Sequence, residues 1–236
     1  MKRKALLIGN TGGLNGVALD VERMAEFLKS RTGGAWLDHE IEPLMNPKKA
    51  ALQSSIQRIK AQAPDYLVLL FSGHGAHDGQ TILELNGNGE TIEESALQKL
   101  ALRQLSIFDC CRVGSEQVKK AMLAMDSLAF RESFDPVRER YDNRIMQAIP
   151  QQVRLYACAV DQCSYDTPNG ALYLNNLLTS AQTIDTSATF KTVELAHAEA
   201  REKTVAQAKY NKDGPQTPQA YLPKCLTTQQ LIISLK

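Results

Sequence analysis

Two short apolar runs in this sequence each end in residues that are able to do chemistry together. Residues 66–71 are followed at once by the sequence SGHG, which contains His74, and residues 105–108 by DCCR, which contains Cys111. A continuous apolar run of this kind is typical of a strand buried on both faces of a parallel sheet. Because the carboxyl ends of parallel strands meet at one edge, we expect His74 and Cys111 to lie side by side. A thiol beside a histidine base is the arrangement that a cysteine nucleophile requires.

The glycines around this pair fit the same chemistry. Gly73 and Gly75 flank His74 and permit a close approach of backbone and substrate. The backbone N–H groups of Gly75 and Cys111 are predicted donors to an oxyanion. A histidine beside a strand is also commonly a packed side chain, and a strand-end cysteine is commonly an inert hydrophobe. The spacing alone leaves both interpretations open.

Strands and helices alternate along the chain, which predicts one α/β domain over residues 1–236. Apolar runs predict strands at residues 4–9, 40–44, 66–71, 105–108, 153–159 and 231–235. Helical patterns cover residues 17–30, 47–63 (with Pro47 at the first position), 93–102, 118–128, 171–180 and 190–210. A small hairpin is expected at residues 79–89. We expect a single sheet of about six mostly parallel strands with helices on both faces.

The overall composition is that of an ordinary soluble globular protein. The 236 residues are 43% hydrophobic and 22% charged, with a formal net charge of +1. This charge balance argues against nucleic acid or an anionic membrane as an obligate partner, and no apolar run is long enough to span a membrane. The basic and apolar N-terminus is too short for a signal peptide. Five cysteines without framework spacing favour a reducing, cytoplasmic location.

The sequence predicts no metal and no cofactor. Its cysteines and histidines do not have the spacing of a zinc site. Residues 76–90 offer only three acids, Asp78, Glu84 and Glu90, whereas calcium takes roughly six to eight oxygen ligands. The Gly-rich loop at residues 10–16 matches neither GxGxxG nor the Gly-Lys-Ser/Thr pattern of a phosphate cradle.

The SGHG and DCC motifs at successive strand ends resemble the catalytic signatures of the caspase-like cysteine peptidases (clan CD, peptidase C14). The Asp-x-Cys form is the one seen in metacaspases and their bacterial relatives, the orthocaspases. Residues 5–20 resemble the family's first strand, loop and helix, residues 161–166 the loop after its fifth strand, and residues 216–219 the segment before its last strand. The resemblance therefore spans nearly the whole chain in the right order.

This resemblance implies a role for each residue of the pair. Cys111 would be the nucleophile and His74 the general base and acid, with Gly75 beside them. Because side chains alternate along a strand, Cys110 is expected to face the core instead. The resemblance gives no role to the three remaining cysteines, Cys158, Cys163 and Cys225.

The resemblance also implies which bond is cut. Caspases hold a substrate aspartate with arginines, but this sequence has Leu14 and Asp166 at two of those positions. Metacaspase-like members line the pocket with acids, and Asp20 and Asp109 match those positions, with Ser72 on the wall. Asp166 is expected to be a further substrate-binding residue. Carboxylates favour a guanidinium or ammonium guest and repel an aspartate. We expect protein or peptide substrates to be cut after Arg or Lys, with Arg preferred for its bidentate geometry.

A cytoplasmic protease of this specificity is expected to be controlled. Residues 112–150 correspond to the family's connection between its large and small parts, a possible linker and activation segment. Basic residues there are candidate self-cleavage sites or members of a solvated helix pair: Lys119, Lys120, Arg131, Arg138, Arg140 and Arg144. The chain carries no adaptor domain, so an activating protein or small-molecule signal is expected instead. By analogy, compact bacterial relatives in defence systems are controlled in such ways.

Two other functions fit parts of the sequence. The chain would serve as a catalytically silent caspase-like scaffold or sensor if the pair were inactive. It would be a Cys–His hydrolase or transferase of another kind if the acidic positions did not form a pocket. Intact His74, Cys111 and acidic positions favour the peptidase over both.

Overall fold

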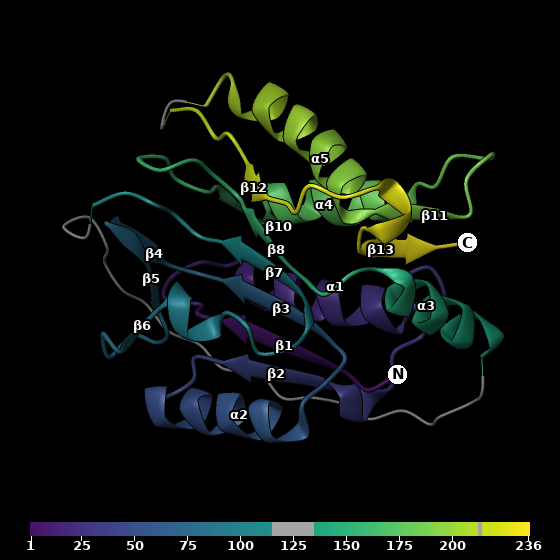
Figure 1. Ribbon diagram of the computed structural model, residues 1–236. Coiled ribbons are helices and arrows are strands. Elements are labelled where there is room, and N and C mark those ends of the chain that lie inside the picture. Colours follow the sequence, from purple (N-terminus) through teal and green to yellow (C-terminus); the bar gives the residue numbers. More distant parts are fainter. Residues whose placement is uncertain (115–134, 212–213) are drawn as a thin grey trace.

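A six-stranded sheet forms the centre of the computed structural model, which describes residues 1–114, 135–211 and 214–236 (Figure 1). Its strands lie in the order β12-β8-β7-β3-β1-β2. Their bounds are β1 (Arg3–Gly9), β2 (Ile41–Met45), β3 (Tyr66–Ser72), β7 (Arg103–Asp109), β8 (Gln151–Tyr156) and β12 (Gln219–Tyr221). Every neighbouring pair is parallel except β12 with β8 at one edge. The predicted α/β fold with a mostly parallel sheet is confirmed.

Helices cover both faces of this sheet, which explains the continuous apolar runs in its central strands β1 and β3. They are α1 (Val17–Lys29), α2 (Lys49–Gln62), α3 (Pro136–Gln147), α4 (Leu172–Gln182) and α5 (Val193–Ala208). Successive side chains of β3 enter two separate apolar clusters. Val68 and Leu70 pack in the cluster that contains residues of α1, α3, α4 and α5, whereas Leu67 and Leu69 pack in the cluster that contains α2.

Several short strands lie outside the central sheet. An antiparallel sheet directly follows β3 and consists of β4 (Gly75–Asp78), β5 (Gln80–Glu84) and β6 (Thr91–Glu93). The remaining pairs are β9 (Asp166–Thr167) with β10 (Gly170–Ala171), and β11 (Phe190–Thr192) with β13 (Ile232–Leu235). The hairpin expected at residues 79–89 is thus part of a larger three-stranded sheet.

One predicted helix is absent as an α-helix, and another begins two residues later than predicted. The helix expected at 93–102 is only a 3₁₀ turn, η2 (Glu94–Leu97), and Lys99 beyond it has a left-handed backbone with φ 55°. The helix expected to begin at Pro47 begins at Lys49, because the residue between them is extended and caps the helix. Neither change moves the strands on either side.

The C-terminal third also differs from the prediction. The single helix expected at 190–210 is divided, because the Thr192 side chain accepts a hydrogen bond from the Leu195 N–H at 3.2 Å and starts α5 there. Residues 190–192 form β11 and pair with β13, so the last predicted strand lies outside the central sheet. The sixth central strand is β12, which has only three residues and was not predicted.

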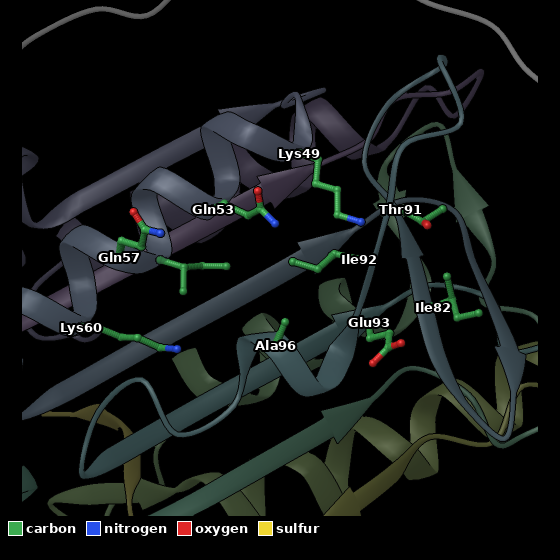
Figure 2. Close-up of a pocket in the computed structure, with 10 residues that line it drawn as sticks. Lys49, Gln53, Gln57, Lys60, Ile82, Thr91, Ile92, Glu93 and Ala96 are labelled. Carbon is green, nitrogen blue, oxygen red and sulfur yellow. The ribbon is translucent and has the colours of Figure 1, made fainter.

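A groove runs between α2 and the small sheet (Figure 2). It encloses about 620 Å³, and Figure 2 shows Lys49 and Lys60 of α2 on one wall with Ile92 and Glu93 on the other. None of the residues that line it belongs to the site predicted from the sequence.

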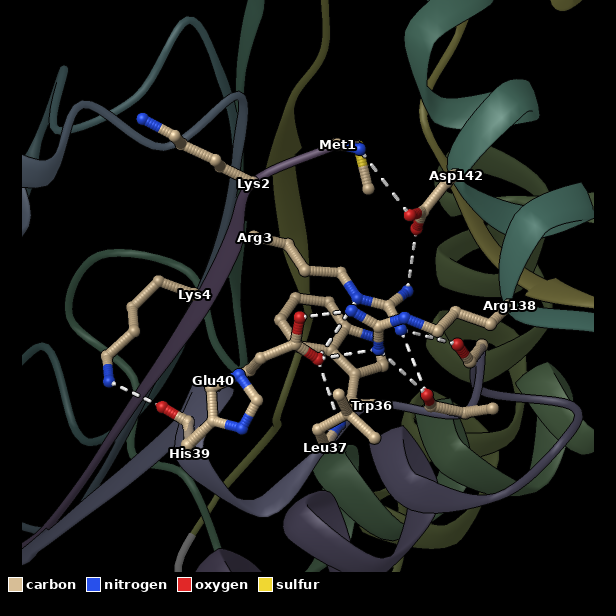
Figure 3. Close-up of polar contacts among 12 residues, drawn as sticks. Met1, Lys2, Arg3, Lys4, Trp36, Leu37, His39, Glu40, Arg138 and Asp142 are labelled. Atoms are coloured by element: carbon tan, nitrogen blue, oxygen red, sulfur yellow. Dashed lines mark hydrogen bonds and ion pairs between the residues drawn. The ribbon is translucent and has the colours of Figure 1, made fainter. Parts of the chain in front are cut away.

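A buried arginine connects the first strand to α3 (Figure 3). The Arg3 guanidinium bonds Asp142 at 3.0 Å and Glu40 at 3.3 Å, and it donates to two backbone carbonyls at 2.9 Å each. It also lies over the Trp36 ring, 4.8 Å from the centroid. Burial alone would raise the pKa of Glu40, but hydrogen bonds, chiefly from Arg138, hold that pKa below its usual value. The cluster is therefore an ionised network between β1 and α3.

The predicted activation segment, residues 112–150, contains the packed helix α3. Arg138 donates to Glu40 at 2.8 Å, and Arg144 donates to the Thr227 carbonyl at 3.1 Å. Cleavage after either arginine would have to disrupt these contacts. Arg140 on the same helix is exposed and donates to the Lys236 carbonyl at 2.8 Å. The predicted helix at 118–128, Lys119, Lys120 and Arg131 lie outside the described residues.

The Arg3 network predicts a large loss of stability on truncation. Replacing Arg3 by Ala leaves Asp142, one buried carbonyl and one part-buried carbonyl without this donor, and we expect the free energy of unfolding to fall by about 3–5 kcal/mol. Urea denaturation measures the change. Arg58→Ala is the control, because Arg58 is 56% exposed in its pair with Glu42 and its loss is expected to cost less than about 1 kcal/mol. Equal losses in the two variants would contradict the assignment.

Candidate active site

The paired ends of β3 and β7 bring the two predicted motifs together. Ser72 is the register partner of Asp109, and His74 and Cys111 each follow two residues later. A Cβ on Gly75 would lie 2.7 Å from the Cys110 sulfur and 2.9 Å from the Cys111 carbonyl oxygen. Glycine at position 75 is therefore what lets the two segments lie against each other. Cys110 is buried in the core on the α2 side, as expected from alternation.

His74 is oriented by the Gly-rich loop after β1. Its Nε2 lies 2.8 Å from the Gly12 carbonyl oxygen, which can only accept a hydrogen bond. Nε2 therefore carries the proton in the neutral ring, and Nδ1 is left as the basic nitrogen. A Cβ on Gly12 would lie 2.6 Å from the His74 ring, so glycine is required there. The sequence did not single out Gly12; a glycine in the loop after β1 was its only signal.

The Cys111 thiol is half-buried and contacts the loop after β8. Its sulfur lies 3.8 Å from the Ser164 carbonyl oxygen, and the Cys163 thiol is close enough to influence its ionisation. The Cys163 hydrogen bond and then burial raise the pKa of Cys111 above its ordinary value. Cys111 is therefore a protonated thiol at neutral pH and would need a base before it could act as a nucleophile. Cys163 had no motif in the sequence that would have identified it.

Asp20 and Ser72 meet beside this strand end. The Ser72 hydroxyl donates to one Asp20 carboxylate oxygen at 2.6 Å, and the Ala171 N–H donates to the other at 2.8 Å. Asp20 lies in the first turn of α1 and is buried. Burial raises its pKa to about 6, although both hydrogen bonds act in the opposite direction.

Asp109 and Asp166 complete an acidic cluster. Asp109 accepts hydrogen bonds from the Ser164 hydroxyl and, at 3.1 Å, from the Leu174 N–H. Burial, followed by the nearby charge of Asp20, raises the pKa of Asp109 to about 7. One Asp166 oxygen accepts from a backbone N–H at 3.1 Å, whereas the other is buried and has no hydrogen-bond partner among the described residues. The predicted pocket residues are thus brought together from four separate parts of the chain.

Comparison with known proteins identifies the class. The family model of the caspase domain matches residues 2–227, so this chain belongs to the caspase family. Family membership supports a cysteine peptidase activity in general. No match was found among curated proteins by sequence. No helix in the described part of the chain is long and apolar enough to cross a membrane.

Solved structures agree on the fold. Caspase-1 from Spodoptera frugiperda superposes with a TM-score of 0.61 at 12% identity, over 93% of this chain and 86% of the insect chain. A protein of Geobacter sulfurreducens superposes with a TM-score of 0.57 at 18% identity, over 94% of this chain and 93% of that one. At these identities the likeness shows the caspase fold and leaves substrate and residue roles to be argued from the site.

The raised pKa of Asp109 predicts a dependence of stability on pH. Since the folded-state pKa of about 7 lies above the usual value of 3.8, the folded protein binds this proton more tightly than the unfolded chain. The free energy of unfolding is therefore expected to fall as pH rises from about 4 to 7, by roughly 2–4 kcal/mol from this group. Asp109→Asn should lack that decline in urea titrations. Parallel pH curves for wild type and variant would contradict it.

The contact between the two thiols predicts a change in reactivity. Removing the Cys163 thiol removes the hydrogen bond that raises the Cys111 pKa, so Cys163→Ala should form more thiolate at neutral pH. We expect the rate of iodoacetamide alkylation at Cys111, followed by peptide mass spectrometry, to rise about threefold or more. Cys163→Ser keeps a hydrogen-bonding group and is the matched control. Unchanged alkylation in Cys163→Ala would contradict this effect.

Proposed function

We propose that this protein is a cysteine endopeptidase that uses His74 and Cys111 and cuts after Arg, and less efficiently after Lys. The observation that carries this proposal is the cluster of three carboxylates at the strand end that bears Cys111, in which Asp20 and Asp109 are buried and Asp166 is half-buried. One oxygen of Asp166 is buried there without a partner among the described residues. The acidic lining also favours the metacaspase-like branch of the family over caspases that bind aspartate.

The proposed reaction begins with proton transfer from the Cys111 thiol to Nδ1 of His74. The Gly12 carbonyl holds the Nε2 proton and stabilises the imidazolium that forms. The thiolate attacks the substrate carbonyl, and the N–H groups of Gly75 and Cys111 are the proposed donors to the oxyanion. His74 then protonates the leaving amine, and water releases the acyl group from the sulfur.

We propose that a cationic substrate side chain takes the place of the protons on the pocket carboxyl groups when it binds. In the empty site, burial keeps the pKa of Asp20 near 6 and that of Asp109 near 7, so ionising both is costly. A guanidinium favours the charged carboxylates through charge-assisted hydrogen bonds, and Asp166 offers the oxygen that has none. An aspartate guest would add a further negative charge to this cluster and be rejected.

Control of the activity is proposed to act on the nucleophile. The protonated Cys111, bonded to Cys163, suits an enzyme that is inactive at rest. An activating protein, a small-molecule signal or self-cleavage would supply the trigger, in a cytoplasmic setting such as bacterial defence. The linker role of residues 112–150 and a single peptidase domain over 1–236 belong to the same proposal.

Peptide cleavage tests this proposal directly. Incubated with a peptide library, with and without cell extract, the wild type should cut after Arg and Lys, and Cys111→Ala should lose about 10³-fold or more of kcat/KM. Asp20→Asn and Asp109→Asn should each lower kcat/KM for Arg substrates by roughly 10- to 100-fold. Glu22→Gln is the matched control, because Glu22 is exposed on the same helix as Asp20.

The other outcomes separate the alternatives. Cleavage after Asp would overturn the pocket assignment, because the three carboxylates would then be facing a like charge. No cleavage under any condition, in protein whose fold is intact by circular dichroism, would favour the silent scaffold or sensor. Hydrolysis of a non-peptide ester or thioester alone would favour the Cys–His hydrolase of another kind.

A further inference from the structure

The backbone holds the segment around Cys111 against the loop after β8. The Arg112 N–H donates to the Gln162 carbonyl at 2.9 Å, and the Asp161 N–H donates to the Arg112 carbonyl at 2.9 Å. These reciprocal bonds align the two segments in opposite directions, which brings Cys111 opposite Cys163. The 3.8 Å contact between the Cys111 sulfur and the Ser164 carbonyl oxygen fits the same alignment.

The two thiols stand opposite each other across this backbone pairing, and both are reachable from solvent. Each of Cys111 and Cys163 is partly exposed, and the nearby Cys163 thiol raises the pKa of Cys111. The proposed peptidase reaction uses Cys111 and has no use for a second thiol beside it. A pair of accessible thiols on directly opposed residues is suited to forming a disulfide after small movements.

The neighbouring cysteines are placed differently. Cys158 and Cys110 are both buried. The Cys158 thiol contacts the Cys110 carbonyl at 3.3 Å and the Gln162 carbonyl at 3.1 Å, so it is held by backbone acceptors. Buried thiols of this kind are inert compared with exposed ones. Cys163 is therefore the thiol that is available to react with Cys111.

We propose that Cys111 and Cys163 form a reversible disulfide when the protein meets a peroxide, and that Cys163 is a redox-modification site. The proposed peptidase function is needed only for the effect on activity, because the disulfide forms whether or not the chain cuts peptides. A disulfide would consume the proposed nucleophile and so switch the peptidase off under oxidising conditions.

The chemistry balances with hydrogen peroxide as the oxidant. The Cys111 thiol loses its proton, its sulfur attacks one peroxide oxygen, and the O–O bond breaks. The sulfur becomes a sulfenic acid, and the hydroxide that leaves takes up the released proton to form water. The Cys163 thiolate then attacks that sulfur, the S–S bond forms, and the S–O bond breaks to release a second water. In total, two thiols are oxidised and one peroxide is reduced. A dithiol such as dithiothreitol reverses the step by two thiol–disulfide exchanges.

Peptide mapping of the full chain tests the link. The protein is treated with one equivalent of hydrogen peroxide, free thiols are blocked, and the tryptic peptides are fragmented. Cys110 shares a peptide with Cys111, and Cys158 shares one with Cys163, so single variants are needed to place the bond. Cys163→Ser should abolish the cross-linked peptide, whereas Cys158→Ser and Cys225→Ser should keep it.

Further oxidation and recovery give a second readout. In Cys163→Ser the sulfenic acid has no partner, so Cys111 should proceed to the irreversible sulfinic acid. Wild-type activity, if the peptidase proposal holds, should fall about tenfold or more and return with dithiothreitol, but should not return in Cys163→Ser. Thermal unfolding of each unoxidised variant checks that it is folded.

Three results would overturn the proposal. One is a cross-link that persists in Cys163→Ser. Another is a cross-link that places Cys158 or Cys110 in the bond. The third is a wild-type protein in which Cys111 becomes sulfinic acid without a linked intermediate. A disulfide found in a protein that cuts no peptide would support the redox site and separately refute the peptidase function.

Discussion

β3 and β7 pair in parallel from Tyr66 with Arg103 to Ser72 with Asp109, and the candidate site depends on that register. Because side chains alternate along a strand, a slip of one residue would turn Asp109 into the core and Cys110 toward the site. The register is fixed by burial on both faces of the sheet. The even-numbered apolar residues of β3 and the odd-numbered apolar residues of β7 pack in the cluster beside α1, and their alternate residues face the cluster beside α2.

The same strand end carries the proposed nucleophile and part of the proposed pocket. Asp109 ends β7 and Cys111 follows two residues later, so the charge and the sulfur are held by one backbone. Asp20 reaches the cluster from α1 and bonds Ser72 at the end of β3. The cost of gathering these carboxylates appears in their raised pKa values, near 6 for Asp20 and near 7 for Asp109. Burial disfavours the charged form of these carboxyl groups, and a bound cation would lower their pKa values again.

The loop after β8 connects selection with the state of the thiol. Ser164 donates its hydroxyl to Asp109 and offers its carbonyl to Cys111, and the adjacent Cys163 bonds the same thiol. Movement of this short loop would therefore change the hydrogen bonding of Asp109 and the surroundings of the Cys111 sulfur at the same time. Elsewhere in the fold, the Arg3 network connects α3 with β1 through the bond from Arg3 to Asp142.

The sequence by itself predicted the parallel sheet, because short apolar runs followed by polar residues are typical of strands buried on both faces. It also predicted that His74 and Cys111 lie at one sheet edge, because both follow parallel strands, and it singled out Asp20, Ser72, Asp109 and Asp166 as pocket candidates through resemblance to a family. Short or capped elements were less predictable: β12 has three residues, and Thr192 divides β11 from α5 by a single hydrogen bond. Local sequence carries too little signal for such elements.

Only the tertiary structure decided which groups support this pair. Gly12 lies 62 residues before His74 and Cys163 lies 52 residues after Cys111, and neither carries a motif. Their contacts arise because the loop after β1 and the loop after β8 fold over the same sheet edge. The environment of the carboxylates was likewise invisible in the sequence, since burial and hydrogen bonds, which set their pKa values, are properties of packing between distant segments.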